Sequence, residues 1–438
     1  MNVNIVSKVL SFLFSLIWLS HTAHASLLPT EHLGKVVSTI SVTGNLKTQE
    51  NIIKRELAFS VGESLGIENI QESLRRLNNL RLFNDISFSY IEEKDHSISV
   101  NIQINERWTT IPIIQAEGGG NTESITLGLY DVNVLGRGLE LGARIQSIDG
   151  QKGGVIWFRN PRLFDQRILL GVDIWQETRN RLLYQPDGQQ SGAYTNNKSR
   201  LHVFAKKEVT KGFFIGAGID YLRNEFDSSA LDSASLEINQ ATGFSLPAKT
   251  EQTVFELSAQ LGELNYDRYL VSGKQTTLEA RFSRETLSSS KSTTLNLNHT
   301  RFYTFKQNHN LGIQLNLGHT NADLLEDQFY LGGLGEIRGY EDRRFSGSNF
   351  WQANLEYRIT GYQTSWLTVQ PVAFTDFGRV SSTFKDLLNN QSTDFASVGL
   401  GLRFIFPKVY RLNARIDFAK TLDSDGRSDI SFGLQQFF

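Results

Sequence analysis

Segments of about ten residues in which apolar and polar side chains alternate recur throughout residues 108–438. From 351 to 359, an apolar row of Trp, Ala, Leu, Tyr and Ile alternates with Gln352, Asn354, Glu356 and Arg358. Successive side chains of a β-strand point to opposite faces, so this period of two predicts strands with one apolar and one polar face. About sixteen such segments are present. The pattern restricts this region to an all-β fold, either a soluble sandwich or a barrel.

The choice between these two folds depends on which face is buried. Polar rows facing inward and apolar rows facing outward require lipid outside the protein and water inside it. Mean hydropathy does not decide, because the value of −0.28 suits both a soluble protein and a barrel with polar residues inside. The alternation by itself leaves the two faces unassigned.

The two ends of the chain favour a membrane barrel. Residues 1–25 resemble an export signal, with Lys8 as the only Lys, Arg, Asp or Glu, an apolar stretch from 9 to 19, and a small-x-small pattern at 23–25. Residues 429–438 alternate and end on Phe438, which resembles the signal by which outer-membrane barrels are delivered for folding, although Gln436 breaks the apolar row. We therefore expect a 16-stranded antiparallel transmembrane β-barrel over residues 107–438, located in the outer membrane.

Residues 36–106 form a separate unit with the order β-α-α-β-β. A strand at 36–42 precedes a helix at 48–58 with Thr48 as a candidate N-cap, and a second helix carries apolar residues at helical spacing from 67 to 77. Two alternating strands follow, at 86–90 and 98–104. This order, with the pieces VTGN, IKREL, VGESL and LRLF, resembles a POTRA domain. The resemblance implies a periplasmic α+β domain whose exposed strand receives other chains through its edge, here along Ile86, Phe88 and Tyr90.

A glycine-rich segment, residues 331–345, contains the tetrapeptide Ile337-Arg338-Gly339-Tyr340, and residues 374–380 read FTDFGRV. With the rest of the chain, these motifs resemble the BamA/TamA-type outer-membrane superfamily, which also contains two-partner-secretion transporters. The resemblance implies that the tetrapeptide lies at the tip of a sixth extracellular loop that folds into the barrel. It also implies that Arg338 pairs with Asp376, the acidic residue of an F-x-D-x-G motif that ends at Gly378.

Two carboxylates are placed to hold such an arginine. Asp376 lies on the more polar face of its predicted strand, and Glu356 shares a face with Arg358 on the preceding strand. A guanidinium in an enclosed lumen needs bidentate carboxylate partners, which two inward acids can supply. The alternative is that Asp376 is an ordinary luminal charge and that Arg338 is solvated.

The first and last strands of the barrel form a second candidate site. Pro112 lies in the first strand and cannot donate a ladder hydrogen bond, while Gly433 interrupts the last strand. In the superfamily this seam opens towards lipid, and a substrate strand pairs with the exposed edge. An equally good interpretation is that Pro112 and Gly433 merely close the barrel.

The predicted function is insertion or translocation of proteins at the outer membrane. The expected partners are outer-membrane lipids, unfolded exported proteins, and a periplasmic or inner-membrane partner of the POTRA domain. One alternative is a secretion pore dedicated to a single partner, although such transporters usually have two POTRA domains and a plug helix. The other alternative is a passive, porin-like channel.

Other classes of function find no support in the residue pattern. Without residues 1–25 the chain carries 43 basic and 46 acidic residues, so it lacks the excess of positive charge that is typical of nucleic-acid-binding proteins. The chain has no cysteine, which removes disulfides, thiol catalysis and Cys-ligated metals. Neither a zinc-protease helix motif nor a nucleophile elbow is present. We therefore expect no enzyme, no catalytic residue, no cofactor and no metal site.

Overall fold

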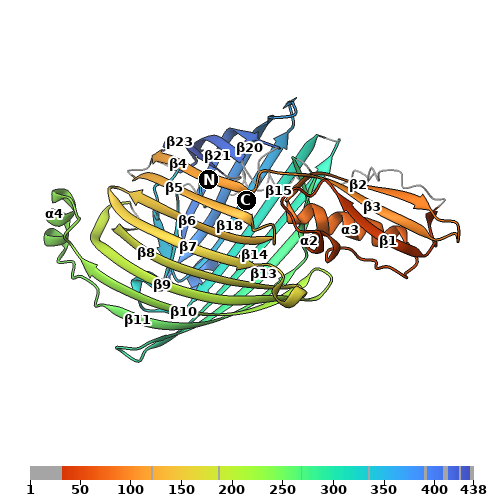
Figure 1. The fold of residues 1–438 in the computed structure, drawn as a ribbon. Coiled ribbons are helices and arrows are strands. Elements are labelled where there is room, and N and C mark those ends of the chain that lie inside the picture. The colour runs from red at the N-terminus through yellow and green to blue at the C-terminus, as the bar shows by residue number, and fades with distance from the viewer. Residues whose placement is uncertain are drawn as a thin grey trace.

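The computed structural model describes residues 32–119, 122–185, 188–267, 269–306, 308–333, 336–388, 392–407, 413–423 and 426–434. The predicted export segment (residues 1–25) and the predicted folding signal at Phe438 lie outside the described residues. The small α+β domain and the barrel occupy opposite ends of Figure 1, joined directly by the chain between Glu106 and Thr110.

The N-terminal domain has the predicted order of elements, β1 (Val37–Thr43), α2 (Glu50–Lys54), α3 (Ile67–Leu80), β2 (Phe83–Glu92) and β3 (Ile98–Glu106). Its sheet has the order β1-β3-β2, with β1 parallel and β2 antiparallel to β3. The apolar stripe of α3, with Ile70 and Leu77 buried, packs against the inward row of β3. Within the described residues β2 pairs only with β3, so β2 is an edge strand.

The first helix is shorter than predicted. It ends at Lys54 instead of residue 58, and its N-cap is Gln49, without a side-chain hydrogen bond to the helix. The prediction that Thr48 caps this helix is wrong. Its hydroxyl instead accepts a hydrogen bond of 2.8 Å from Asn133 of the barrel, so the residue connects the two regions.

The barrel consists of eighteen labelled strands, but two of them are continuations. Both β11 and β12 pair with β13, and both β18 and β19 pair with β20, which leaves sixteen wall strands and confirms the predicted number. Neighbours are antiparallel, and β23 meets β4 to close the barrel. The strands are β4 (Thr110–Gly119), β5 (Thr122–Val134), β6 (Leu139–Ile148), β7 (Gln151–Asn160), β8 (Ile168–Tyr184), β9 (Gln190–Thr210), β10 (Phe213–Asp227), β11 (Thr250–Leu261), β12 (Leu264–Asp267), β13 (Leu270–Glu285), β14 (Lys291–Phe305), β15 (His309–Thr320), β18 (Asn349–Ile359), β19 (Tyr362–Gln363), β20 (Thr368–Ser381), β21 (Thr393–Ile405), β22 (Asn413–Thr421) and β23 (Ser428–Leu434).

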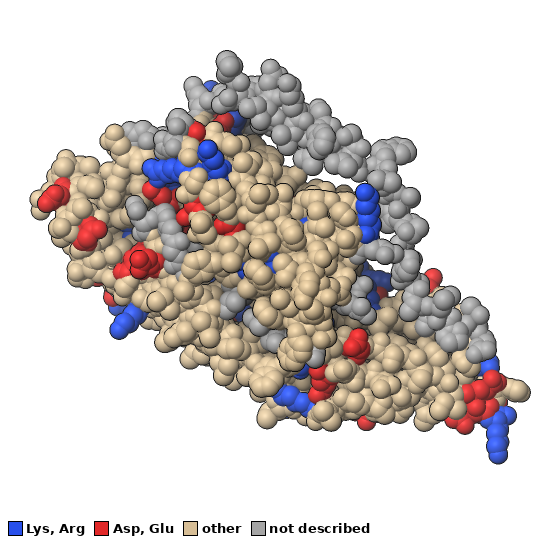
Figure 2. All heavy atoms as spheres, turned by 90° about the horizontal axis from the view of Figure 1, so that it is seen from above, with Lys and Arg blue, Asp and Glu red and all other residues tan. Residues whose placement is uncertain are grey.

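The polar faces of the strands point into the barrel and the apolar faces point outward. In β18 the polar row of Gln352, Asn354, Glu356 and Arg358 is buried. In β22 the opposite row is exposed, with Ile416 and Phe418 each about half accessible. Figure 2 shows broad areas of the barrel surface without Lys, Arg, Asp or Glu. An apolar exterior around a polar interior requires lipid outside, so the soluble sandwich is excluded.

Among the residues that the structure describes, no helix has the length and apolar character needed to cross a membrane.

Leu400 offers a direct test of which face meets the lipid. Its side chain is 66% exposed near the middle of β21, where Leu400→Arg is expected to cost about 2–4 kcal/mol of folding free energy in a bilayer. The control is Leu287→Arg, because Leu287 is similarly exposed but lies in the turn between β13 and β14. Urea unfolding of the two variants in vesicles should separate them clearly. Equal stability would contradict the assigned orientation.

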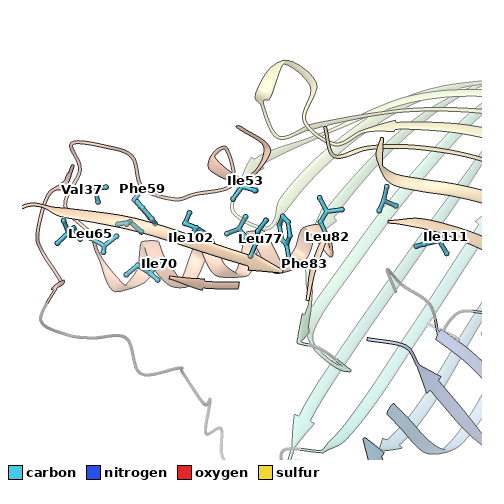
Figure 3. Close-up of a cluster of buried hydrophobic side chains, with 14 residues drawn as sticks. Val37, Ile53, Phe59, Leu65, Ile70, Leu77, Leu82, Phe83, Ile102 and Ile111 are labelled. Carbon is cyan, nitrogen blue, oxygen red and sulfur yellow. The ribbon is translucent and has the colours of Figure 1, made fainter. Parts of the chain in front are cut away.

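The N-terminal domain packs against the strand turns at one end of the barrel. Its apolar core extends to Ile111 of β4, as Figure 3 shows. Glu56, almost fully buried, receives a bidentate hydrogen-bonded ion pair from Arg162. Lys211 lies 3.0 Å from Glu72 of α3. Burial raises the pKa of the Glu72 carboxyl, but hydrogen bonds from Arg75, Arg76 and Lys211 outweigh burial and hold the pKa well below its usual value.

Candidate functional site: an arginine buried by the sixth loop

The sixth connection at the other end of the barrel, residues 321–348, turns into the lumen. It contains a short helix, η3 (Leu325–Asp327), and two short strands that pair with each other, β16 (Phe329–Leu331) and β17 (Phe345–Gly347). Gly339 has a φ of +92°, and a Cβ there would lie 3.3 Å from the Cβ of Ala419 on β22. Glycine is therefore required where the tip of the loop presses against the wall.

The guanidinium of Arg338 is held by Asp376 on β20, the thirteenth wall strand. Nε donates to Oδ2 and Nη2 donates to Oδ1, each at 2.7 Å, and the backbone N–H of Arg338 also donates to Oδ2 at 3.1 Å. Asn354 donates to Oδ1 at 2.9 Å. Both charged side chains have no solvent exposure. In such a site, removal of one partner typically costs about 3–5 kcal/mol, because the other charge stays buried without compensation.

A wider charge network surrounds this pair. Arg338 Nη1 lies 3.4 Å from Glu356 Oε2 and 3.7 Å from Asp417 Oδ2. Arg403 of β21 joins the two carboxylates, donating to Glu356 Oε1 at 2.6 Å and to Asp417 Oδ1 at 2.6 Å. Arg358 and Arg415 also lie within ion-pair distance of the same acids. Within the described residues, the cluster contains four arginines and three carboxylates, and it spans β18, β20, β21 and β22.

Small residues on β21 make room for this network. Arg338 lies over the ring of Phe374, with its Cζ 3.5 Å from the ring centroid. A Cβ on Gly399 would come within 2.2 Å of the Phe374 ring, and a Cβ on Gly401 within 2.0 Å of Asp417 Oδ1. Either substitution would displace one side of the arginine site.

The other predicted residues of the loop fix the tip in place. Ile337 is fully buried beside Phe350 and Phe395, and Tyr340 donates to the carbonyl of Ala396 at 3.0 Å. A Cβ on Gly378 would come within 2.6 Å of the Phe395 ring, so this glycine lets the ring lie against the wall. Ile337, Arg338, Gly339, Tyr340, Glu356, Asp376 and Gly378 are thus brought together. Arg403, Asp417, Arg358 and Arg415 also belong to this site, and the sequence alone did not predict them there.

The seam residues lie on the two strands that close the barrel. Pro112 is exposed on β4 and is paired in register with Leu129 of β5. Gly433 lies on β23, paired in register with Arg415 of β22. Both strands of the seam therefore carry a residue that weakens regular pairing.

The predicted POTRA edge residues lie on β2, but their side chains do not point to solvent. Ile86, Phe88 and Tyr90 are half-buried against the apolar core of the domain. The exposed row of the same strand is Ser87, Ser89 and Ile91. A chain added to β2 would therefore use main-chain hydrogen bonds, with these exposed residues as its neighbours.

A family model for the Omp85 superfamily domain matches residues 133–438, more than half of the chain. The chain belongs to the Omp85 superfamily. A second family model, POTRA, described as a surface antigen variable number repeat, matches residues 35–107. This Omp85 barrel lies in the outer membrane with its POTRA domain in the periplasm. The sixth loop therefore enters from the extracellular side.

Two curated relatives are outer membrane protein assembly factors named BamA. The protein from Neorickettsia risticii is 24% identical over 223 residues, 48% of this chain and 29% of that protein. The one from Neisseria meningitidis serogroup B is 21% identical over 333 residues, 70% of this chain and 40% of that protein. The Omp85 chain described here thus spans well under half the length of these relatives in the matched regions.

Solved structures share the fold. CdiB from Acinetobacter baumannii superposes with a TM-score of 0.61 at 13% identity, covering 92% of this chain and 74% of CdiB. BamA from Haemophilus ducreyi lacking POTRA domains 1–3 gives a TM-score of 0.54 at 16% identity, covering 91% of this chain and 84% of that chain. The likeness extends across both the POTRA domain and the barrel.

Proposed function

We propose that this Omp85 protein inserts proteins into the outer membrane, or moves them across it, and that a substrate strand pairs at the seam between β23 and β4. The POTRA domain receives the substrate or a partner by strand addition along β2. Superfamily membership, as a family-level inference, favours assembly or transport over catalysis.

The buried pair of Arg338 and Asp376 carries the proposal. It holds the sixth loop inside the lumen on β20. The surrounding ion pairs extend to β18, β21 and β22, and β22 is the neighbour of the last strand. A loop held there obstructs free diffusion through the lumen, which argues against a passive channel. It also stiffens the wall on one side of the seam, so the barrel would open between β23 and β4 and not within that part of the wall.

A dedicated secretion pore is the second candidate, because the fold likeness to CdiB is at least as extensive as that to BamA. Transport through the lumen would require the sixth loop to leave its site. An insertase that opens at the seam has no such requirement. The two candidates therefore predict different effects of breaking the Arg338–Asp376 pair and of cross-linking β4 to β23 at the seam.

The role of the POTRA edge can be tested by photocrosslinking. A photoreactive residue at Ser89, which is exposed on β2, should crosslink to a newly exported protein in intact cells. The matched control is Ser60, an exposed residue of the same domain outside the sheet. We expect adducts from Ser89 and few from Ser60. Equal crosslinking from both positions, or none from Ser89, would contradict the proposed strand addition along β2.

A further inference from the structure

A second group of charged side chains, separate from the Arg338 cluster, lines the lumen. Asp173 of β8, His202 of β9, Asp220 of β10 and Glu256 of β11 lie on the inner face of four consecutive strands. Asp173 and Asp220 are the register partners of His202 on its two sides. The strands β9–β11 are the sixth to eighth of the sixteen, which places the group about halfway round the barrel from the seam.

The imidazole of His202 lies between two carboxylates. Its Nδ1 is 3.6 Å from Asp173 Oδ2, and its Nε2 is 3.7 Å from Glu256 Oε2. His202 is only 9% exposed, and its Nε2 is buried without a hydrogen-bond partner among the described residues. A lone pair of a neutral imidazole that faces a carboxylate, with nothing between them, is unfavourable. A cation between these atoms would remove the conflict.

The surrounding charges also favour a cation. Among the described residues, four carboxylates and three guanidinium groups are joined to one another or to His202 by ion pairs here, which leaves one negative charge in excess within this set when His202 is neutral. The groups are Asp173, Asp220, Glu256 and Glu279, and Arg159, Arg200 and Arg281. Asp220, fully buried, accepts from Arg200 at 2.6 Å and from Arg281 at 3.2 Å. A carboxylate has about four lone-pair sites, so these two bonds leave further positions on Asp220.

We propose that His202 Nε2, Asp220 and Glu256 bind a divalent zinc ion. The ligand atoms of these three residues all lie within 4.8 Å of one another. Bonds of 2.0–2.2 Å at a tetrahedral angle put two ligands about 3.4 Å apart, and the 3.7 Å between His202 Nε2 and Glu256 Oε2 is close to that separation. Small rotations of the carboxylates would complete the site, with the fourth position left to water.

The neighbouring residues match the supports that a zinc histidine needs. Asp173 faces Nδ1, and Arg159 holds Asp173 at 2.7 Å. A carboxylate in that position selects the Nδ1–H tautomer, so that Nε2 presents its lone pair to the metal. Gly218 leaves the space beside Nε2 open, because a Cβ there would lie 3.1 Å from that nitrogen. The ring of His202 is fixed further by stacking on Phe204, with 4.9 Å between centroids.

A bound zinc ion would clamp β9, β10 and β11 together. That part of the wall would then stay rigid while the opposite side, at the seam, is free to open. The zinc site itself stands on the contacts of His202 and does not depend on the proposed function.

The test is metal binding to the folded full-length chain in detergent, purified without a polyhistidine tag. We expect saturable Zn²⁺ binding that raises the unfolding temperature, and a visible absorption band of tetrahedral Co²⁺ when Co²⁺ replaces it. His202→Gln and Glu256→Gln should each weaken binding at least tenfold. Gly218→Ala should also weaken it, while leaving all ligands present. The matched control is His299→Gln on β14, whose ring contacts Thr276 at 2.8 Å.

Each outcome decides the proposal. Loss of the Zn²⁺ effect in the His202 and Glu256 variants, with the His299 variant unchanged, supports the site. If His202→Gln does not fold, as judged by the heat-dependent gel shift, then Glu256→Gln and Gly218→Ala provide the same comparison. Absence of saturable binding in the native chain, or equal binding in native and variant chains, would overturn the proposal.

Discussion

Arg338→Ala is expected to release the sixth loop from the lumen and to lower protein insertion by tenfold or more. Asp376 loses the guanidinium that donates to both of its oxygens, and once the loop leaves it also loses the backbone N–H of residue 338. Among the described residues, the amide of Asn354 is then its remaining hydrogen-bond donor. A loss of about 3 kcal/mol corresponds to more than a hundredfold increase in the population of the released loop. Insertion of an unfolded barrel protein into vesicles measures the activity.

Release of the loop can be measured separately. The chain has no native cysteine, so a single Ile337→Cys change gives a unique thiol at a fully buried position of the loop tip. We expect slow reaction with a maleimide in the otherwise native chain and much faster reaction when Arg338→Ala is added. Unchanged protection of this thiol would mean that Arg338 does not hold the loop.

The pairing is tested by a double-mutant cycle between Arg338→Ala and Asp376→Ala. Asp376→Ala leaves four arginines against two carboxylates in the cluster, so it should be at least as damaging as Arg338→Ala. If the two residues act as one pair, the double change costs much less than the sum of the single changes. Arg338→Lys should restore little, because an ammonium lacks the planar fork that meets both oxygens. Additive losses would show that Arg338 and Asp376 do not act as a pair.

Arg379 on the same strand is the matched control. It also makes a bidentate pair, with Asp394 at 2.7 and 2.9 Å, but Asp394 is 61% exposed. An exposed pair typically contributes about 0–1 kcal/mol. Arg379→Ala should therefore leave insertion and loop protection close to native. A large loss in this variant would show that charge removal anywhere on β20 is damaging.

Alternation along single strands was enough to place Glu356 and Asp376 on the polar face. It left open which face points inward, because that depends on the medium around the molecule and not on the period of the strand. The buried polar row of β18 and the exposed Leu400 of β21 settle it. The number of strands also followed from the alternation, since each segment folds as one wall strand.

The rest of the arginine site could not be found strand by strand. Asp417 reaches Arg338, and Arg403 reaches Glu356 and Asp417, only because the register pairs Gly401 with Asp417 across β21 and β22. Register between strands comes from turns and packing, which a single sequence specifies weakly. A usable signal was present, since glycine opposite a charged inward residue marks space for that side chain. The same reasoning would have drawn attention to Gly218 beside His202.

The second large effect is expected at the seam. Within β4 and β23, Ile113, Gln115, Ser431 and Gly433 share the inward side of the wall, so a cysteine on each strand can meet its counterpart there. A small panel of pairs covers the possible alignments of the two strands. The control staple joins Thr277 and Asn298, which are register partners on β13 and β14. This control cross-links two neighbouring strands that, in the proposed mechanism, do not separate.

Insertion by the stapled barrel is the measurement that tests the account most directly. If substrates leave through the seam between β4 and β23, oxidation of a seam pair should abolish insertion, reductant should restore it, and the control staple should have no effect. A seam pair that is fully oxidised, as shown by mass spectrometry, yet inserts or transports substrate at the native rate would falsify the lateral opening. That result would leave passage through the lumen as the remaining route.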